Sequence, residues 1–175
     1  VEAQLNTQFT QPGQAGTLTT YDPWASYCAG LQALVDLPAL QKAIQSGQLT
    51  VFADVMHGSA ATGLERLLGM PINELNGEAD PLFEGGAPEP LPKYLGRMLS
   101  TVKAYEPKVD GGLIAGLVFD GDSDRIAAVD GQGNFLSSQI LIPILIDHLK
   151  TEKGMTGEVI KTISGSNIIP KVAAL

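Results

Sequence analysis

The feature that most constrains the fold is an alternation of short apolar runs with segments of helical periodicity. Residues 113–119 are wholly apolar and residues 49–56 nearly so, and both runs have the length of buried strands. Apolar residues recur at steps of three and four in residues 24–35, 60–68 and 91–102, as on one face of a helix. This alternation predicts an α/β fold: a mainly parallel sheet with helices on both faces.

The remaining segments complete this prediction. Asp36 is expected to cap a helix that has Pro38 in its first turn and ends before Gly47. Further expectations are a short strand at 72–75, a loop at 76–92, a hairpin formed by 125–129 and 134–136, a helix at 140–149, a strand at 158–163 and a helix from Ser166 onward. The domains expected are a linker or edge segment at 1–15, one complete domain at 16–136 and one truncated domain at 137–175.

Composition excludes several classes of function. The 19 acidic residues outnumber the 11 basic ones and no Lys/Arg block exists, so no nucleic-acid interface is expected. The uncharged stretch at residues 131–146 contains Gln, Asn and Ser, so no membrane span is expected either. The lone Cys28 excludes a disulfide framework and suits a cytoplasmic protein. Its place in an apolar stripe predicts a buried, inert thiol.

The chemistry concentrates in residues 120–125, directly after the most apolar strand. Asp120, Asp122 and Asp124 alternate there, and two carboxylates about 4 Å apart repel by roughly 4 kcal/mol at an effective dielectric constant near 20. Three such groups therefore require a cation or a raised pKa, and oxygen ligands favour Mg²⁺. Gly121 permits the tight turn, and the planar guanidinium of Arg125 suits a phosphate group beside the cation.

This segment also admits other interpretations. A solvated acidic turn rarely follows seven apolar residues. An EF-hand fails because Arg125 and Gly131 stand where that loop needs Gly and Glu. Asp120 as an aspartyl nucleophile, with Asp122 two residues on, resembles the haloacid-dehalogenase-type phosphatases, and this alternative stays open.

Several motifs together resemble one family. Asp120-Gly-Asp-Ser-Asp-Arg125 matches the metal loop of the α-D-phosphohexomutases, which include phosphoglucomutases and phosphomannomutases. Tyr21-Asp-Pro23, Asp54-Val-Met-His-Gly58 and the segment from Asp80 to Pro90 also resemble motifs of that family. The similarity extends from about Thr20 to the end of the chain. It implies that the chain holds the second domain and the start of the third domain of a four-domain enzyme.

The resemblance implies an activity and a set of site residues. The family moves a phosphoryl group between carbons one and six of a hexose, through a phosphoserine on the first domain and a bisphosphorylated sugar. Asp120, Asp122 and Asp124 would hold Mg²⁺, and Arg125 would be the catalytic, phosphate-binding residue. The partners would be a hexose phosphate and the other domains of the same chain. The 175 residues alone would be inactive and bind Mg²⁺ weakly.

Other functional interpretations carry less weight. The chain is alternatively a free-standing metal- or anion-binding module with no catalytic role. His57 is expected to make a structural hydrogen bond and not to act as a base. Ser166 is expected to cap a helix, although the turn formed by residues 164–167 also presents backbone amides to which an anion can bind.

Overall fold

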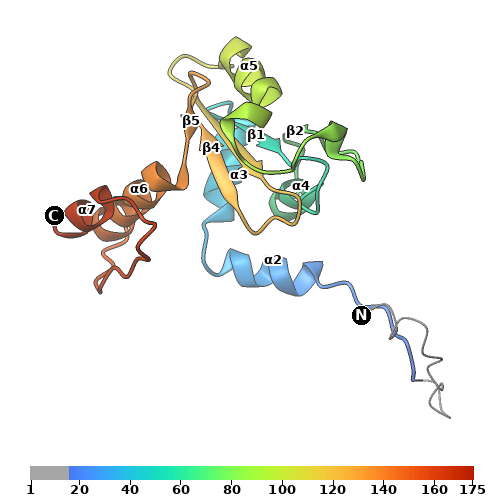
Figure 1. Ribbon diagram of the computed structural model, residues 1–175, viewed down its shortest axis with the longest axis horizontal. Coiled ribbons are helices and arrows are strands. Elements are labelled where there is room, and N and C mark those ends of the chain that lie inside the picture. The colour runs from blue at the N-terminus through green and yellow to red at the C-terminus, as the bar shows by residue number, and fades with distance from the viewer. Residues whose placement is uncertain (1–15) are drawn as a thin grey trace, which may run out of the picture. The chain divides into compact units, whose positions relative to one another are not determined.

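The computed structural model describes residues 16–175, which fall into two units with their boundary between Val35 and Asp36 (Figure 1). The first unit contains the helix α2 (Trp24–Gln32), and the second unit contains every described strand. The segment predicted as a linker or edge, residues 1–15, lies outside the described residues. Within residues 16–175, no helix combines the length and apolar character needed to cross a membrane.

Helix α2 forms where the apolar periodicity predicts it. The Asp22 side chain accepts a hydrogen bond from the Trp24 backbone N–H at 3.0 Å, and the Trp24 and Tyr27 rings meet edge to face, 6.0 Å apart. The predicted burial is wrong, because no residue of α2 is buried and Cys28 is only half-buried. Periodicity identifies the apolar face of a helix but does not supply the surface that covers it.

Five strands form one mixed sheet in the order β2-β1-β3-β4-β5. The strand β1 (Leu49–Asp54) pairs in parallel with β2 (Asn73–Leu75) and with β3 (Leu113–Phe119). The strands β4 (Ile126–Val129) and β5 (Phe135–Leu136) extend the sheet as the predicted antiparallel hairpin. The α/β prediction is confirmed, and the parallel strands β2, β1 and β3 end at the same edge of the sheet.

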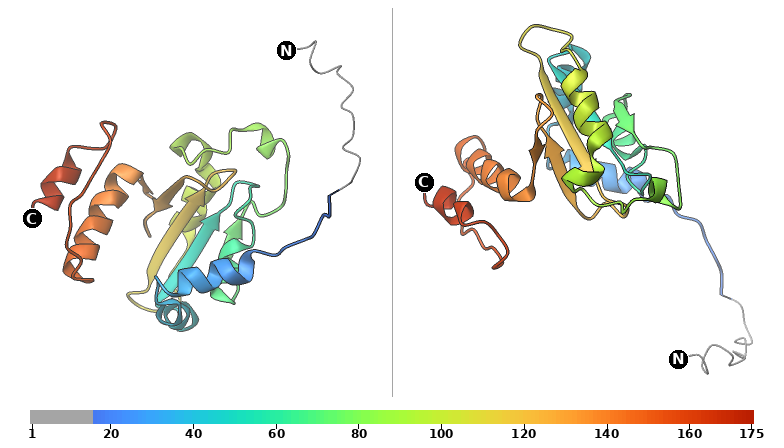
Figure 2. Two further views of the ribbon diagram at one scale, coloured as in Figure 1. Left: turned by 90° about the horizontal axis from the view of Figure 1, so that it is seen from below. Right: turned by 45° about the horizontal axis from the view of Figure 1, so that its top comes forward.

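Helices lie on both faces of this sheet (Figure 2). The helix α3 (Leu37–Gln45) contacts β1 and begins with the predicted cap, because the Asp36 carboxylate accepts the Ala39 N–H at 3.0 Å. The helix α5 (Gly96–Ala104) crosses β1, β3 and β4 on the opposite face. Along the chain, the short helix α4 (Gly63–Leu68) connects β1 and β2. The loop between β2 and α5 contains the 3₁₀ turns η1 (Phe83–Gly85) and η2 (Pro92–Tyr94).

The core lies between α5 and the sheet. Its buried side chains come from the region of β1, from the region of α5, and from β3 and β4. They are Phe52, Met56, Leu95, Met98, Val102, Val118, Ala127 and Val129. Gly116 allows the helix to approach β3 closely, since a Cβ there would lie 2.5 Å from Met98 Cε and 2.9 Å from Val129 Cβ. The core thus anchors β3 directly before the acidic segment that follows it.

The last part of the chain differs from the prediction in one element. The helix α6 (Ser138–Thr151) packs against α7 (Ile168–Ala173). The residue at the N-cap of α7 is Asn167 and not the expected Ser166, although the Ser166 Oγ accepts the Ile168 N–H at 3.2 Å. The strand predicted at 158–163 is wrong: Ile160 and Ile163 are almost fully exposed, and no described segment pairs with them. A strand needs a hydrogen-bonded neighbour, which an apolar pattern alone does not guarantee.

A pair of methionine substitutions tests this core. Met98 lies on α5 and is fully buried, whereas Met155 is 58% exposed. We expect Met98→Ala to lower the free energy of unfolding by about 2–5 kcal/mol, because it leaves a cavity. Met155→Ala is expected to change that free energy by about 0.5 kcal/mol or less. Urea unfolding of both variants checks this, and equal losses would contradict the assigned core.

Candidate metal centre

The carboxylate of Asp120 closes the turn that follows β3. Asp120 is fully buried, and its two oxygens accept the Arg125 backbone N–H at 3.0 Å and the Arg125 Nε–H at 2.6 Å. Burial raises the pKa of Asp120, but these hydrogen bonds and the guanidinium charge outweigh burial, so the net pKa lies below its usual value. Arg125 therefore fixes the Asp120 carboxylate in place through both of its oxygens.

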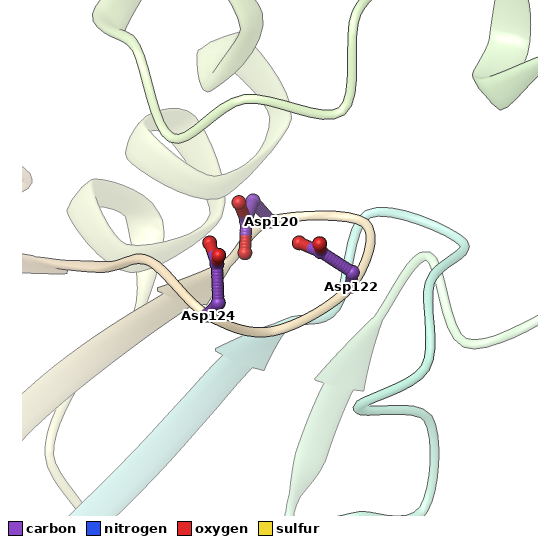
Figure 3. Close-up of side chains that lie close together, drawn as sticks. All are labelled: Asp120, Asp122 and Asp124. Carbon is purple, nitrogen blue, oxygen red and sulfur yellow. The ribbon is translucent and has the colours of Figure 1, made fainter.

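Asp122 and Asp124 bring their carboxylates close to that of Asp120 (Figure 3). One oxygen from each of the three lies within 4.8 Å of the others, and both Asp122 and Asp124 are exposed. The neighbouring carboxylates of Asp122 and then Asp120 raise the pKa of Asp124. Within residues 16–175, this is the only cluster of at least three potential metal-ligating side chains. Its oxygen donors and uncompensated charge fit a hard divalent cation such as Mg²⁺.

Backbone contacts from two other loops hold residues 120–125 at Gly121; this segment is named the metal loop after the family motif that it resembles. The Gly121 N–H donates to the Pro88 carbonyl at 3.1 Å, and the Gly121 carbonyl accepts the Ser59 N–H at 2.9 Å. A Cβ on Gly121 would lie 2.9 Å from Pro88 Cγ, and one on Gly58 would lie 2.4 Å from the Gly121 carbonyl oxygen. The segments that follow β1 and β2 therefore enclose the turn between Asp120 and Asp122.

The proline-rich loop, residues 78–90, supplies one side of this enclosure. Asp80 organises its first turn, since its carboxylate accepts the Glu84 N–H at 2.8 Å and the Leu82 N–H at 2.9 Å, which lowers the pKa of Asp80. Phe83 and Glu84 lie in the left-handed backbone region, with φ of 50° and 53°. Each such residue costs on the order of 1–3 kcal/mol, so the surrounding contacts must hold the loop in this shape.

His57 has the structural role that the sequence predicts. Its Nδ1 lies 2.7 Å from the Glu78 carbonyl oxygen, so this nitrogen carries a proton and donates it. Its Nε2 lies 3.7 Å from Glu84 Oε1 and has no hydrogen-bond partner among the described residues. The side chain borders a cavity of about 170 Å³ beneath the proline-rich loop, whose lining also includes Asn76, Phe83 and Tyr94.

Arg125 carries the positive charge beside the triad. Its side chain is 57% exposed, with Nη1 3.6 Å from Glu89 Oε1 and Nε 3.6 Å from Asp124 Oδ1. Its hydrogen bond to Asp120 raises the pKa of the guanidinium, so the group remains a cation. An exposed cation fixed beside three carboxylates can contact a phosphate that approaches a bound metal ion.

The sequence analysis therefore identified the charged residues of the site and missed the uncharged residues that hold their loop in place. Asp120, Asp122, Asp124 and Arg125 all lie together as expected. Gly58, Ser59 and Pro88 were not recognised as neighbours of the metal loop. The available signal was topological, because the carboxyl ends of parallel strands share one edge of a sheet.

Gly58→Ala tests the enclosure without altering a charged group. The added Cβ collides with backbone atoms of Gly121, so the metal loop must shift, and we expect its affinity for Mn²⁺ to fall at least about threefold through this overpacking. Gly96→Ala is the matched control, since a Cβ at Gly96 meets no atom within 4 Å. Calorimetric titration with Mn²⁺ measures both, and unchanged affinity in Gly58→Ala would contradict the enclosure.

The raised pKa of Asp124 makes cation binding sensitive to acid. As the pH falls, this carboxyl takes up a proton at a higher pH than an ordinary aspartate, whose pKa is about 3.9, and the proton competes with a cation. We expect Asp122→Asn to lower the Asp124 pKa, because it removes the largest repulsion. NMR titration of the Asp124 carboxyl carbon measures the change, and an unaltered pKa would show that the two carboxylates do not interact.

Comparison with known proteins places this site in a family. A family model described as "Phosphoglucomutase/phosphomannomutase, alpha/beta/alpha domain II" matches residues 25–133. A probable phosphoglucosamine mutase of Methanothermobacter thermautotrophicus is 28% identical over 158 residues, which are 87% of this chain and 30% of that protein. A phosphoglucomutase/phosphomannomutase of Thermococcus kodakarensis is 27% identical, over 91% of this chain and 33% of that protein.

Solved structures agree with these sequence matches. A putative phosphomannomutase from Thermus thermophilus superposes with a TM-score of 0.73 and 28% identity, over 89% of this chain and 35% of that one. The chain thus spans about a third of the length of these relatives. Because the family model covers more than half of its residues, the chain belongs to the phosphoglucomutase/phosphomannomutase family, and residues 25–133 match its domain II.

Proposed function

We propose that residues 120–125 are the Mg²⁺ site of a phosphohexomutase. The observation that carries this proposal is the convergence of three carboxylates within 4.8 Å, beside the exposed cation of Arg125, at the end of β3 in a domain of this family. In the longer protein, the reaction would move a phosphoryl group between carbons one and six of a hexose phosphate.

The residues of this chain would have different roles at the proposed site. A bound Mg²⁺ would neutralise the charge that develops on the oxygens of the transferring phosphoryl group. Asp120, fixed by Arg125, would provide a rigid ligand, and the exposed Asp122 and Asp124 would provide the other two carboxylate ligands. The guanidinium of Arg125 would orient the phosphoryl group through its planar pair of N–H donors.

The rest of the catalytic apparatus would come from other parts of the longer protein. The resemblance implies a phosphoserine, one oxygen of which completes the Mg²⁺ site, and residues that select the sugar. The relatives are named as phosphoglucosamine mutases and phosphoglucomutase/phosphomannomutases, which supports a hexose phosphate as the substrate class. On this proposal, residues 16–136 form the second domain and residues 137–175 begin the third.

Two substitutions in the longer enzyme test the proposal. Asp122→Asn removes one ligand charge, and we expect kcat/KM to fall on the order of a hundredfold, as when a group that stabilises the transition state is lost. Arg125→Lys keeps the charge but loses the two-pronged contact, so a smaller loss, on the order of tenfold, is expected. Asp147→Asn, an exposed position on α6, is the matched control.

A coupled mutase assay at saturating Mg²⁺ measures these losses, and cation titration of the 175-residue chain measures binding without turnover. Wild-type turnover in Asp122→Asn would overturn the metal assignment. Equal activity with Arg and Lys at position 125 would overturn the role of the planar guanidinium.

A further inference from the structure

Arg97 lies outside the metal loop and contacts both the residue directly after β2 and the proline-rich loop, residues 78–90. It lies in the first turn of α5, and its guanidinium is 54% exposed. Its Nη1 donates to the Asn76 side-chain oxygen, directly after β2, and its Nη2 donates to Glu84 Oε1 and Oε2 at 3.0 and 3.3 Å. One side chain thus connects the carboxyl end of β2 with the proline-rich loop.

The Asn76 end of this connection is firmly held. The Asn76 side-chain N–H donates at 2.8 Å to the buried carboxylate of Asp54, at the end of β1, and that carboxylate also accepts the Met56 N–H at 3.1 Å. Asn76 itself has a φ of 55°, a conformation that side-chain contacts help to maintain. Arg97 is therefore anchored to the sheet through Asn76 and Asp54.

The Glu84 end of the connection leads to the metal loop. Glu84 and its neighbour Phe83 both have left-handed backbone conformations, so this turn depends on external contacts. A Cβ at Gly121 would lie 3.6 Å from the Phe83 ring, and the Pro88 carbonyl accepts the Gly121 N–H. The same loop places Glu89 3.6 Å from the Arg125 guanidinium.

We infer that Arg97 is a positioning residue for the metal loop: it clamps Glu84 to Asn76, and the proline-rich loop transmits this restraint to Gly121, between Asp120 and Asp122. These hydrogen bonds of Arg97 reach neither the triad nor Arg125, so its effect is indirect. This inference rests on the proposed function for its consequence, but the restraint itself is measurable without metal or substrate.

The alternative is that Arg97 and Glu84 form an ordinary surface ion pair of little energetic value. Two features distinguish the clamp from such a pair. The guanidinium contacts two points of the loop between β2 and α5 at once, Asn76 at its start and Glu84 within it, and a lysine cannot reproduce this planar, forked arrangement. In addition, the contact on Glu84 restrains a turn whose backbone conformation is intrinsically unfavourable.

Amide hydrogen exchange of Gly121, followed by NMR in the 175-residue chain, tests the restraint directly. We expect Arg97→Ala to accelerate exchange at Gly121 by about two- to fivefold, the range for loss of an exposed charge contact, with little change at Val118 within β3. Arg97→Lys should lie between wild type and Arg97→Ala. Lys103→Ala, which removes a cation from the far end of the same helix, is the matched control.

The outcomes separate this inference from the proposed function. In Arg97→Ala, faster exchange at Gly121 but not at Val118 supports the clamp. Binding of Mn²⁺ at about neutral pH should then also be about two- to fivefold weaker. Unchanged exchange at Gly121, or equal acceleration at Val118, would overturn the clamp, because the effect would then be absent or global. If Asp122→Asn still binds Mn²⁺ as wild type does, the proposed metal site fails whatever Arg97 does. Arg97→Lys keeps the test valid if Arg97→Ala does not fold.

Discussion

Repulsion among three carboxylates is the constraint on which the site depends. Asp120, Asp122 and Asp124 hold oxygens within 4.8 Å of one another, and a mobile chain would separate them. Asp120 cannot move away, because it is buried and Arg125 donates to both of its oxygens. An unpaired carboxylate in that position would be strongly destabilising, so the ion pair with Arg125 is required wherever Asp120 is buried.

The parallel part of the sheet supplies the second requirement, a rigid frame around the loop. Because β1, β2 and β3 end at one edge, the segments after β1 and β2 meet the turn after β3. Both contacts on Gly121 are made by backbone groups, from Ser59 and from Pro88. Backbone hydrogen bonds carry no net charge, so they hold the loop without neutralising the carboxylates that a cation needs.

The charged part of the site and most of the fold were predictable from the sequence. The run at 113–119 became β3 with the same bounds, and the acidic alternation after it placed all three carboxylates on one turn. The contacts of Gly58, Pro88 and Arg97 were not predictable, because each joins segments distant in the sequence. The strand expected at 158–163 failed for a related reason: Ile160 and Ile163 are apolar, but pairing depends on a neighbour that no local pattern specifies.

The site also shows how glycine positions can be as restrictive as ligands. At Gly121 a Cβ would meet Pro88, and at Gly58 it would meet the backbone of Gly121, although neither glycine has a positive φ. The requirement at both positions is therefore close approach between loops and not backbone conformation. This explains why a loop that carries three like charges can be short: its shape is determined by steric contact on both sides of Gly121. The side chains of Asp122 and Asp124 are then left exposed toward solvent, where an incoming cation can reach them.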